Sequence, residues 1–155
     1  MVIHRFECAM FLPLARERVF DFFSDASNLA RITPTEMHFR IVTPQPIGMA
    51  AGTTIEYGIR VFGLRLRWLS LISRWDPPRE FVDEQLRGPY RQWIHIHRFE
   101  EQSDGTQILD HVEYVLPWGL VGRAVHPLVK RRLDAIFQFR QSATRRILLA
   151  GASQK

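Results

Sequence analysis

Polar and apolar residues alternate with a period of two along most of the chain between residues 37 and 116. This alternation is typical of strands that bury one face. Glycine, proline and other turn residues interrupt it at short intervals, and strands joined by short turns pair antiparallel. The predicted strands cover residues 2–12, 37–43, 53–61, 64–75, 81–87, 92–102 and 106–116.

Helical periodicity replaces the alternation in two regions. A helix over residues 15–23 is followed by a second short helix over residues 29–32, which Pro34 ends. After Gly122 an apolar stripe continues to about residue 150 and predicts a helix of about 25 residues, with Pro127 in its first turn or at a bend. Such a helix is about 40 Å long, like a strand of about 11 residues. It can therefore lie along a curved sheet and leave a cavity where side chains are too few to fill the space.

One predicted strand combines polar and aromatic groups on a single face. Trp93, His95, His97 and Phe99 fall on the same side of residues 92–102. Two imidazoles between two aromatic rings place polar groups in an apolar wall, as a small-molecule pocket requires.

Further motifs extend along the chain. They are Pro78-Arg79-Glu80-Phe81-Val82-Asp83-Glu84-Gln85, Gly88-Pro89-Tyr90, Trp93-x-His95-x-His97-x-Phe99, Gly105-Thr106, Asp110-x-Val112-Glu113-Tyr114-x-Leu116-Pro117-x-Gly119 and Phe137-x-Phe139-Arg140. Together with the order of elements, they resemble a bacterial branch of the SRPBCC superfamily, which includes START domains, birch-pollen allergens and polyketide cyclase/dehydrase-like proteins. The resemblance implies an α+β helix-grip fold, with a curved antiparallel sheet around a long C-terminal helix. It also implies a hydrophobic or amphipathic small ligand held between sheet and helix.

Composition narrows the classes of protein and partner. The 155 residues are 46% hydrophobic and 12% aromatic, which favours a globular domain over residues 1–150, with a tail at 151–155. The net charge is +5, but the basic residues are scattered and form no known reading module, so we expect no nucleic-acid partner. Cys8 is the only cysteine, and neither a signal-like stretch nor a membrane-spanning stretch occurs, which predicts a cytoplasmic protein.

The histidine pair allows several interpretations. His95 or His97 could work with Asp110, on the next predicted strand, in acid–base chemistry, or the three could simply form structural hydrogen bonds. A shared metal is a third interpretation, but no third histidine or cysteine has ligand spacing, so we predict no metal and no cofactor.

Other candidate ligand-binding residues lie on the predicted inner face and on the last helix. Arg140 interrupts the helix's apolar stripe and must be paired, either with a ligand carboxylate or, as we expect, with Asp83 or Glu113. The remaining candidates are aromatic and would form the wall for an apolar ligand: Tyr57, Trp68, Trp93, Phe99, Tyr114 and Phe137.

These patterns favour a protein that binds a lipid, polyketide or aromatic-like molecule in an internal cavity. We expect its entrance to be bounded by residues 44–51, the turn at residues 88–89 and the start of the last helix. One alternative is a cyclase or dehydratase that uses His95 or His97 with Asp110. Another is an adaptor that contacts a membrane or a protein through the basic run at residues 130–132.

Overall fold

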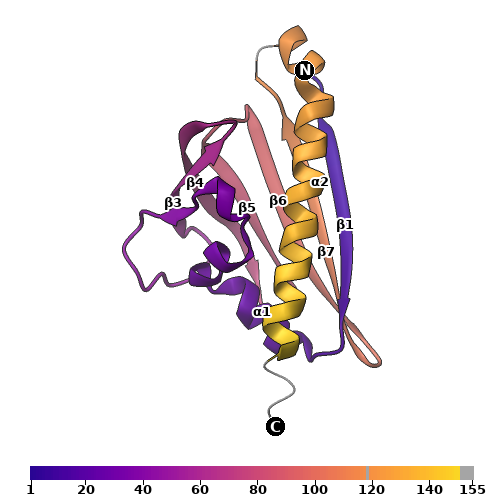
Figure 1. Cartoon of the computed structure of the whole chain (residues 1–155). Helices are drawn as coiled ribbons and strands as arrows, with labels where there is room; N and C mark the ends of the chain where they lie inside the picture. Colours follow the sequence, from indigo (N-terminus) through magenta and orange to yellow (C-terminus); the bar gives the residue numbers. More distant parts are fainter. Residues whose placement is uncertain (118, 151–155) are drawn as a thin grey trace.

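The computed structural model describes residues 1–117 and 119–150, and Figure 1 shows a sheet with one long helix lying along it. The strands are β1 (His4–Leu12), β2 (Arg40–Ile41), β3 (Thr54–Val61), β4 (Leu64–Asp76), β5 (Glu80–Arg87), β6 (Gln92–Gln102) and β7 (Gly105–Val115). The helices are α1 (Arg16–Ser24), the 3₁₀ helices η1 (Ala26–Ile32) and η2 (Thr35–Met37), and α2 (Gly119–Ala150). The tail predicted for residues 151–155 lies outside the described residues.

The seven strands form one antiparallel sheet in the order β1-β7-β6-β5-β4-β3-β2. Strands from β2 to β7 each pair with the next in the chain, and from β3 onward short turns join them. The exception is β1, which pairs with the last strand, β7, along its whole length, from His4↔Tyr114 to Leu12↔Thr106. The predicted antiparallel sheet around a C-terminal helix is therefore confirmed.

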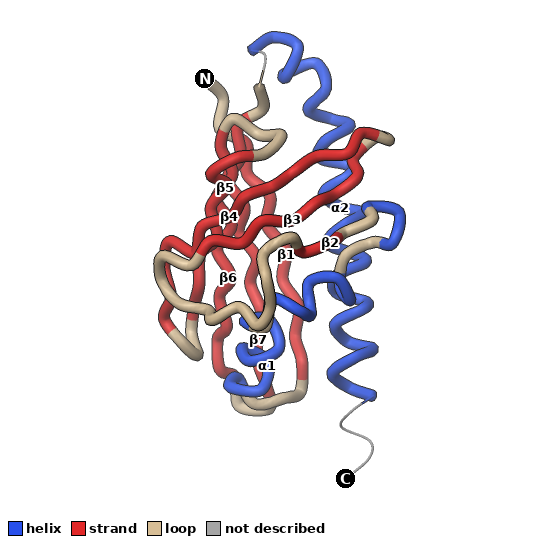
Figure 2. Tube along the Cα trace, turned by 90° about the vertical axis from the view of Figure 1, so that its left-hand side faces the viewer, coloured by secondary structure: helices blue, strands red, loops and turns tan. Residues whose placement is uncertain are grey.

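Two groups of buried side chains lie between the sheet and the helices. The first, in which Phe20 and Phe23 both contact Phe99, joins α1 to β6 and β7. The second, which includes Trp68, Trp93 and Phe137, lies between α2 and the middle of the sheet. Figure 2 shows the backbone from the side, with most of the sheet on one side of the molecule and α2 on the other. The second group borders the site described below.

Three predicted elements differ from those in the structure. The strand predicted at residues 37–43 shrinks to Arg40–Ile41, because His38 adopts a left-handed conformation (φ 45°) that an extended strand does not allow. The second short helix is a 3₁₀ helix. The last helix begins earlier than predicted, at Gly119, so Pro127 lies inside it rather than in its first turn. Its first turns lean away from the axis of the remainder (Figure 2).

In the part of the chain that the structure describes, no helix combines the length and the apolar character needed to cross a bilayer.

Candidate functional site

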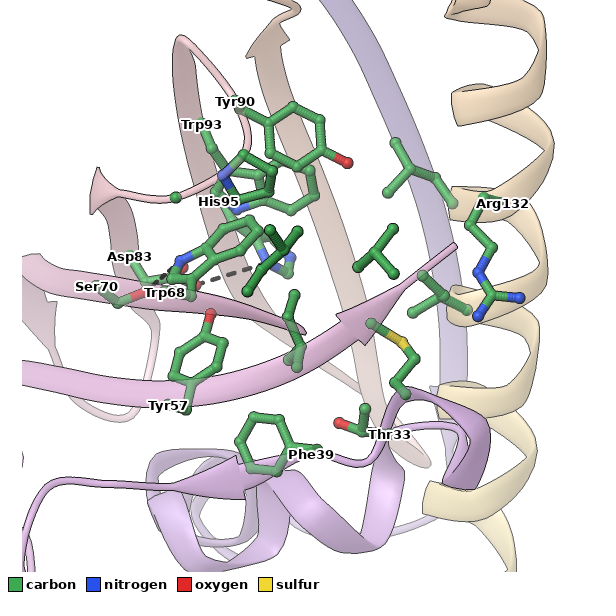
Figure 3. A pocket seen from close by; sticks show the side chains of 18 of the residues that line it. Thr33, Phe39, Tyr57, Trp68, Ser70, Asp83, Tyr90, Trp93, His95 and Arg132 are labelled. Atoms are coloured by element: carbon green, nitrogen blue, oxygen red, sulfur yellow. Dashed lines mark hydrogen bonds and ion pairs between the residues drawn. The ribbon is translucent and has the colours of Figure 1, made fainter. Parts of the chain in front are cut away.

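A cavity of about 720 Å³ lies between the sheet and α2. Its walls are mainly apolar, and Figure 3 shows Tyr57, Trp68 and Trp93 among the rings that face it. The lining includes Met49, Pro89 and Val125, one from each of the three segments predicted to bound the entrance. A space of this size falls within the range of small-molecule pockets, roughly 300–1,000 Å³.

Alternation along the strands explains which side chains reach this cavity. Trp68, Ser70 and Ile72 are buried on one face of β4, as the period of two predicted, whereas Arg65 and Arg67 are exposed on the other. On β6, Trp93, His95 and His97 are likewise buried on the inner face.

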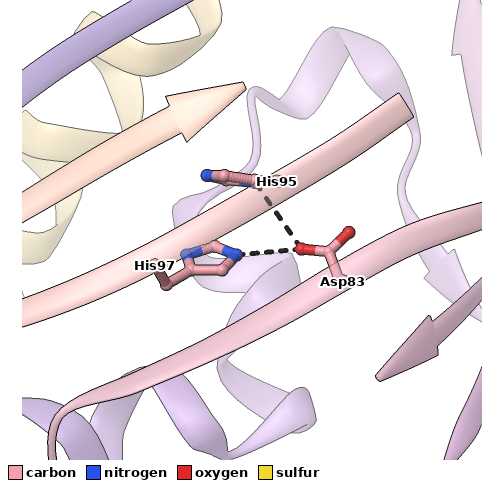
Figure 4. Close-up of side chains that lie close together, drawn as sticks. All are labelled: Asp83, His95 and His97. Carbon is pink, nitrogen blue, oxygen red and sulfur yellow. Dashed lines mark hydrogen bonds and ion pairs between the residues drawn. The ribbon is translucent and has the colours of Figure 1, made fainter. Parts of the chain in front are cut away.

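Two histidines and an aspartate meet at the wall of the cavity (Figure 4). His95 and His97 come from β6, and Asp83 lies opposite His95 on the neighbouring strand β5. The Oδ2 atom of Asp83 is 2.9 Å from His97 Nε2 and 3.6 Å from His95 Nδ1. The imidazole rings overlap, with centroids 3.7 Å apart.

Asp110 lies on the other side of the imidazoles, where β7 pairs with β6. Its Oδ1 atom is 2.8 Å from His95 Nε2 and 3.3 Å from His97 Nδ1. The shorter contact is a hydrogen bond, whereas His97 Nδ1 is buried without an aligned partner among the described residues. The predicted grouping of His95, His97 and Asp110 is confirmed, but Asp110 lies behind the cavity wall rather than in it.

The cluster shifts the pKa of each of its members. Burial, together with the neighbouring His97, lowers the pKa of His95 to about 4, against the opposing effect of the two aspartates. Burial also acts to lower the pKa of His97, but contacts with Asp110 and Asp83 outweigh it, and the pKa is raised. Burial acts to raise the pKa of both carboxyl groups, but the hydrogen bonds and charges of the histidines outweigh it, so both are lowered. At neutral pH the two aspartates are therefore ionised and His95 is neutral.

Two predicted ligand-binding aromatics belong to the core instead. Phe99 is 1% exposed and packs against Phe20 and Phe23. Tyr114 is also 1% exposed, and its hydroxyl group lies 3.1 Å from His126 Nε2. Neither side chain lines the cavity. Both face inward as predicted, but α1 covers Phe99, and the start of α2 covers Tyr114.

The other predicted residues, Tyr57, Trp68, Trp93, Phe137 and Arg140, line the cavity. The predicted ion pair of Arg140 with Asp83 or Glu113 does not form among the described residues: Asp83 lies against the histidines, and Glu113 pairs with Arg5 on the outer face. The guanidinium carbon of Arg140 lies instead 5.6 Å from the ring centroid of Phe23, and its Nε atom is buried without a hydrogen-bond partner among the described residues.

Asp83 was not predicted to contact the histidines. Its position follows from the pairing of β5 with β6, in which Asp83 lies opposite His95. The alternation of residues 81–87 placed Asp83 on one face, and this was the only signal that could have found it. With Asp83 included, the cavity wall offers imidazole and carboxylate atoms that can exchange a proton or coordinate an ion.

No protein-family model matches this chain, and no curated protein matches it. Solved structures do match, although at low identity. The Zhui aromatase/cyclase from Streptomyces sp. R1128 covers 97% of this chain and 99% of its own, with 17% identity and a TM-score of 0.75. The protein TTHA0849 from Thermus thermophilus covers 94% of this chain and 99% of its own, with 16% identity and a TM-score of 0.72.

A third similar structure is major latex-like protein 151 from Panax ginseng, which covers 90% of this chain and 96% of its own, with 8% identity and a TM-score of 0.63. At these identities the likeness establishes the fold. The helix-grip fold that the resemblance implied is therefore confirmed.

Proposed function

We propose that this protein binds a hydrophobic or amphipathic small molecule in the cavity between the sheet and α2. The observation that carries the proposal is a mainly apolar cavity of about 720 Å³ whose wall also contains the histidine–aspartate cluster and Arg140. A cavity that stayed empty would forfeit packing contacts along its whole lining, whereas an apolar ligand supplies them.

The walls indicate the shape and chemistry of the ligand. Tyr57 and Trp68 stack with an interplanar angle of 14°, and the ring of Trp93 lies edge-on to Trp68. Such rings suit a flat or extended apolar body, such as that of a lipid, a polyketide or an aromatic compound. Arg140 and the histidine–aspartate cluster would face a single polar end of the molecule.

Native mass spectrometry of gently purified protein tests the proposal, because an apolar compound should co-purify at one molecule per chain. A solution test uses the fluorescent probe anilinonaphthalene sulfonate. Leu66→Trp, which fills part of the cavity, should weaken probe binding about tenfold or more, a cost of about 1.4 kcal/mol.

The matched control is Arg65→Trp, which adds the same ring on the exposed face one position away. Equal probe affinity in the two variants would contradict binding in this cavity. The cyclase or dehydratase alternative stays a prediction, and it requires His95→Gln to abolish turnover without loss of the fold.

A further inference from the structure

We propose that Asp83, His95 and His97 bind a divalent transition-metal ion at the wall of the cavity, with Asp110 holding the two imidazoles from behind. The sequence has no third histidine or cysteine at ligand spacing, so it predicted no metal. The structure supplies a carboxylate from the neighbouring strand instead.

The positions of the ligand atoms fit one ion. One nitrogen from each histidine and one carboxylate oxygen of Asp83 all lie within 4.8 Å of one another. Bonds from such an ion to imidazole nitrogen and carboxylate oxygen are about 2.0–2.2 Å long, so two ligands of one ion lie roughly 3–4 Å apart. The distances from Asp83 Oδ2, 2.9 Å to His97 Nε2 and 3.6 Å to His95 Nδ1, fall in or next to that range.

Asp110 is placed as an outer partner of both ligands. Each histidine turns one ring nitrogen toward Asp83 and the other toward Oδ1 of Asp110, at 2.8 Å for His95 and 3.3 Å for His97. A metal-binding histidine commonly donates its other N–H to a carboxylate, which fixes the tautomer and the direction of the lone pair. In this cluster a single carboxylate serves both rings.

One ring nitrogen of the cluster gives a second reason for a cation. The N–H groups of two neutral imidazoles meet the two hydrogen bonds of the cluster, His95 Nε2 to Asp110 Oδ1 at 2.8 Å and His97 Nε2 to Asp83 Oδ2 at 2.9 Å. His97 Nδ1 then stays buried without a hydrogen-bond partner among the described residues. A divalent ion at Asp83 would take His97 Nε2 as a ligand and move the N–H to Nδ1, which faces Asp110 Oδ1 at 3.3 Å.

The surroundings hold the rings in place and select the kind of ion. Phe81 stacks on His97 with centroids 4.2 Å apart, and Phe137 packs edge-on against His95 at 5.5 Å. Imidazole ligands favour zinc and the neighbouring transition metals over magnesium or calcium. Three protein ligands leave coordination positions open, and Asp83, His95 and His97 all line the cavity, so the ion would meet whatever the cavity holds.

The test uses cobalt(II) alone as the probe, added to full-length protein from which a chelator has removed metals. We expect one equivalent to bind and to give intense visible absorption bands, which zinc(II) then displaces. Asp83→Asn and His95→Gln should each abolish these bands. Asp110→Asn should weaken cobalt binding by roughly 10- to 100-fold, the usual effect of losing an outer partner.

His111→Gln is the matched control, because His111 lies on β7 but contacts Glu7 on the outer face of the sheet. Cobalt bands that persist in both Asp83→Asn and His95→Gln, or that are lost equally in His111→Gln, would overturn the metal site, as would the absence of bands in the wild type. Circular dichroism identifies a variant that fails to fold, and the cobalt bands of the other variant then decide the test. The titration contains no organic ligand, so its failure is distinct from a failure of cavity binding.

Discussion

Glu80 is a nearly buried carboxylate that two arginines stabilise. It begins β5 with only 9% of its surface exposed, between arginines of two neighbouring strands. Arg74 donates a hydrogen bond to its Oε1 at 2.7 Å, and Arg98 donates one to its Oε2 at 2.9 Å. Burial acts to raise the pKa of Glu80, but the two arginines outweigh it, so the pKa is lowered.

The pKa of Glu80 is lower in the folded state than in the unfolded state. Ionised Glu80 therefore stabilises the fold above the ordinary glutamate pKa of 4.5. This contribution is lost as the pH falls through the pKa of the folded state. Glu80→Gln should lower the unfolding free energy at pH 7 by about 1–3 kcal/mol. Urea unfolding across a pH series should show that the gap in unfolding free energy between the variant and the wild type becomes smaller at acidic pH. Glu100→Gln, at an exposed position of β6, should show no such gap. A gap that stays constant with pH would contradict this role.

The residues of the candidate site were predictable to different degrees. The side chain period of two placed His95, His97 and Asp110 on inner faces, and they do meet. The same period cannot say which helix covers an inward residue, so Phe99 and Tyr114 were assigned to the cavity although they lie in the core. Asp83 was missed as a histidine partner because its neighbour depends on the pairing of β5 with β6, which the residues between the two strands do not reveal.

At the scale of elements, close approach of the backbone fixes where β7 meets β1. Gly105 begins β7, and a Cβ atom at this position would collide with the carbonyl oxygen of Leu12 and come within 2.8 Å of Pro13 Cα. Backbone atoms cannot move aside as the end of a flexible side chain can. The end of β1 therefore requires glycine at this position.

Gly105→Ala should lower the unfolding free energy by about 1–3 kcal/mol, since the strand ends must separate to admit the methyl group. Thermal and urea unfolding measure the change. Gly48→Ala is the control, because nothing lies within 4 Å of a Cβ built there. Similar stability of the two variants would show that the ends of β1 and β7 separate at little cost in free energy.

The strands from β3 to β7 could be read from the sequence to within one residue at either end, because glycine and proline mark their turns. The region between α1 and β3 could not be. Its 3₁₀ turns and its two-residue strand are set by local hydrogen bonds, such as that from the Glu56 amide to Thr43 Oγ1, rather than by any hydrophobic period.

On the scale of the whole molecule, apolar and basic side chains gather around one end of the cavity. Phe62 and Leu64, at the turn between β3 and β4, are 60% and 67% exposed, and Leu128 of α2 is 53% exposed. All three also line the cavity. Arg131 is exposed nearby on α2, whereas Arg132 lines the cavity and lies 3.7 Å from Glu36.

A transient membrane contact at this end predicts that the protein sediments with anionic vesicles and not with neutral ones. Replacing Lys130 and Arg131 with glutamine should weaken vesicle binding by about 1 kcal/mol, or about fivefold, per residue. Arg145→Gln with Arg146→Gln removes the same charge from the far end of α2 and should have a smaller effect. Equal losses in the two pairs would indicate attraction to the overall charge alone.

The pairing of the first strand with the last bears on how the chain folds during translation. Arg5 and Glu113, which form an ion pair between β1 and β7, are 108 positions apart. The N-terminal strand therefore leaves the ribosome long before its neighbour exists, and its apolar face stays unprotected meanwhile. Contacts so distant in sequence slow folding and expose intermediates to aggregation. A chaperone that shields residues 4–12 should accordingly raise the yield of native protein more than one that acts after release.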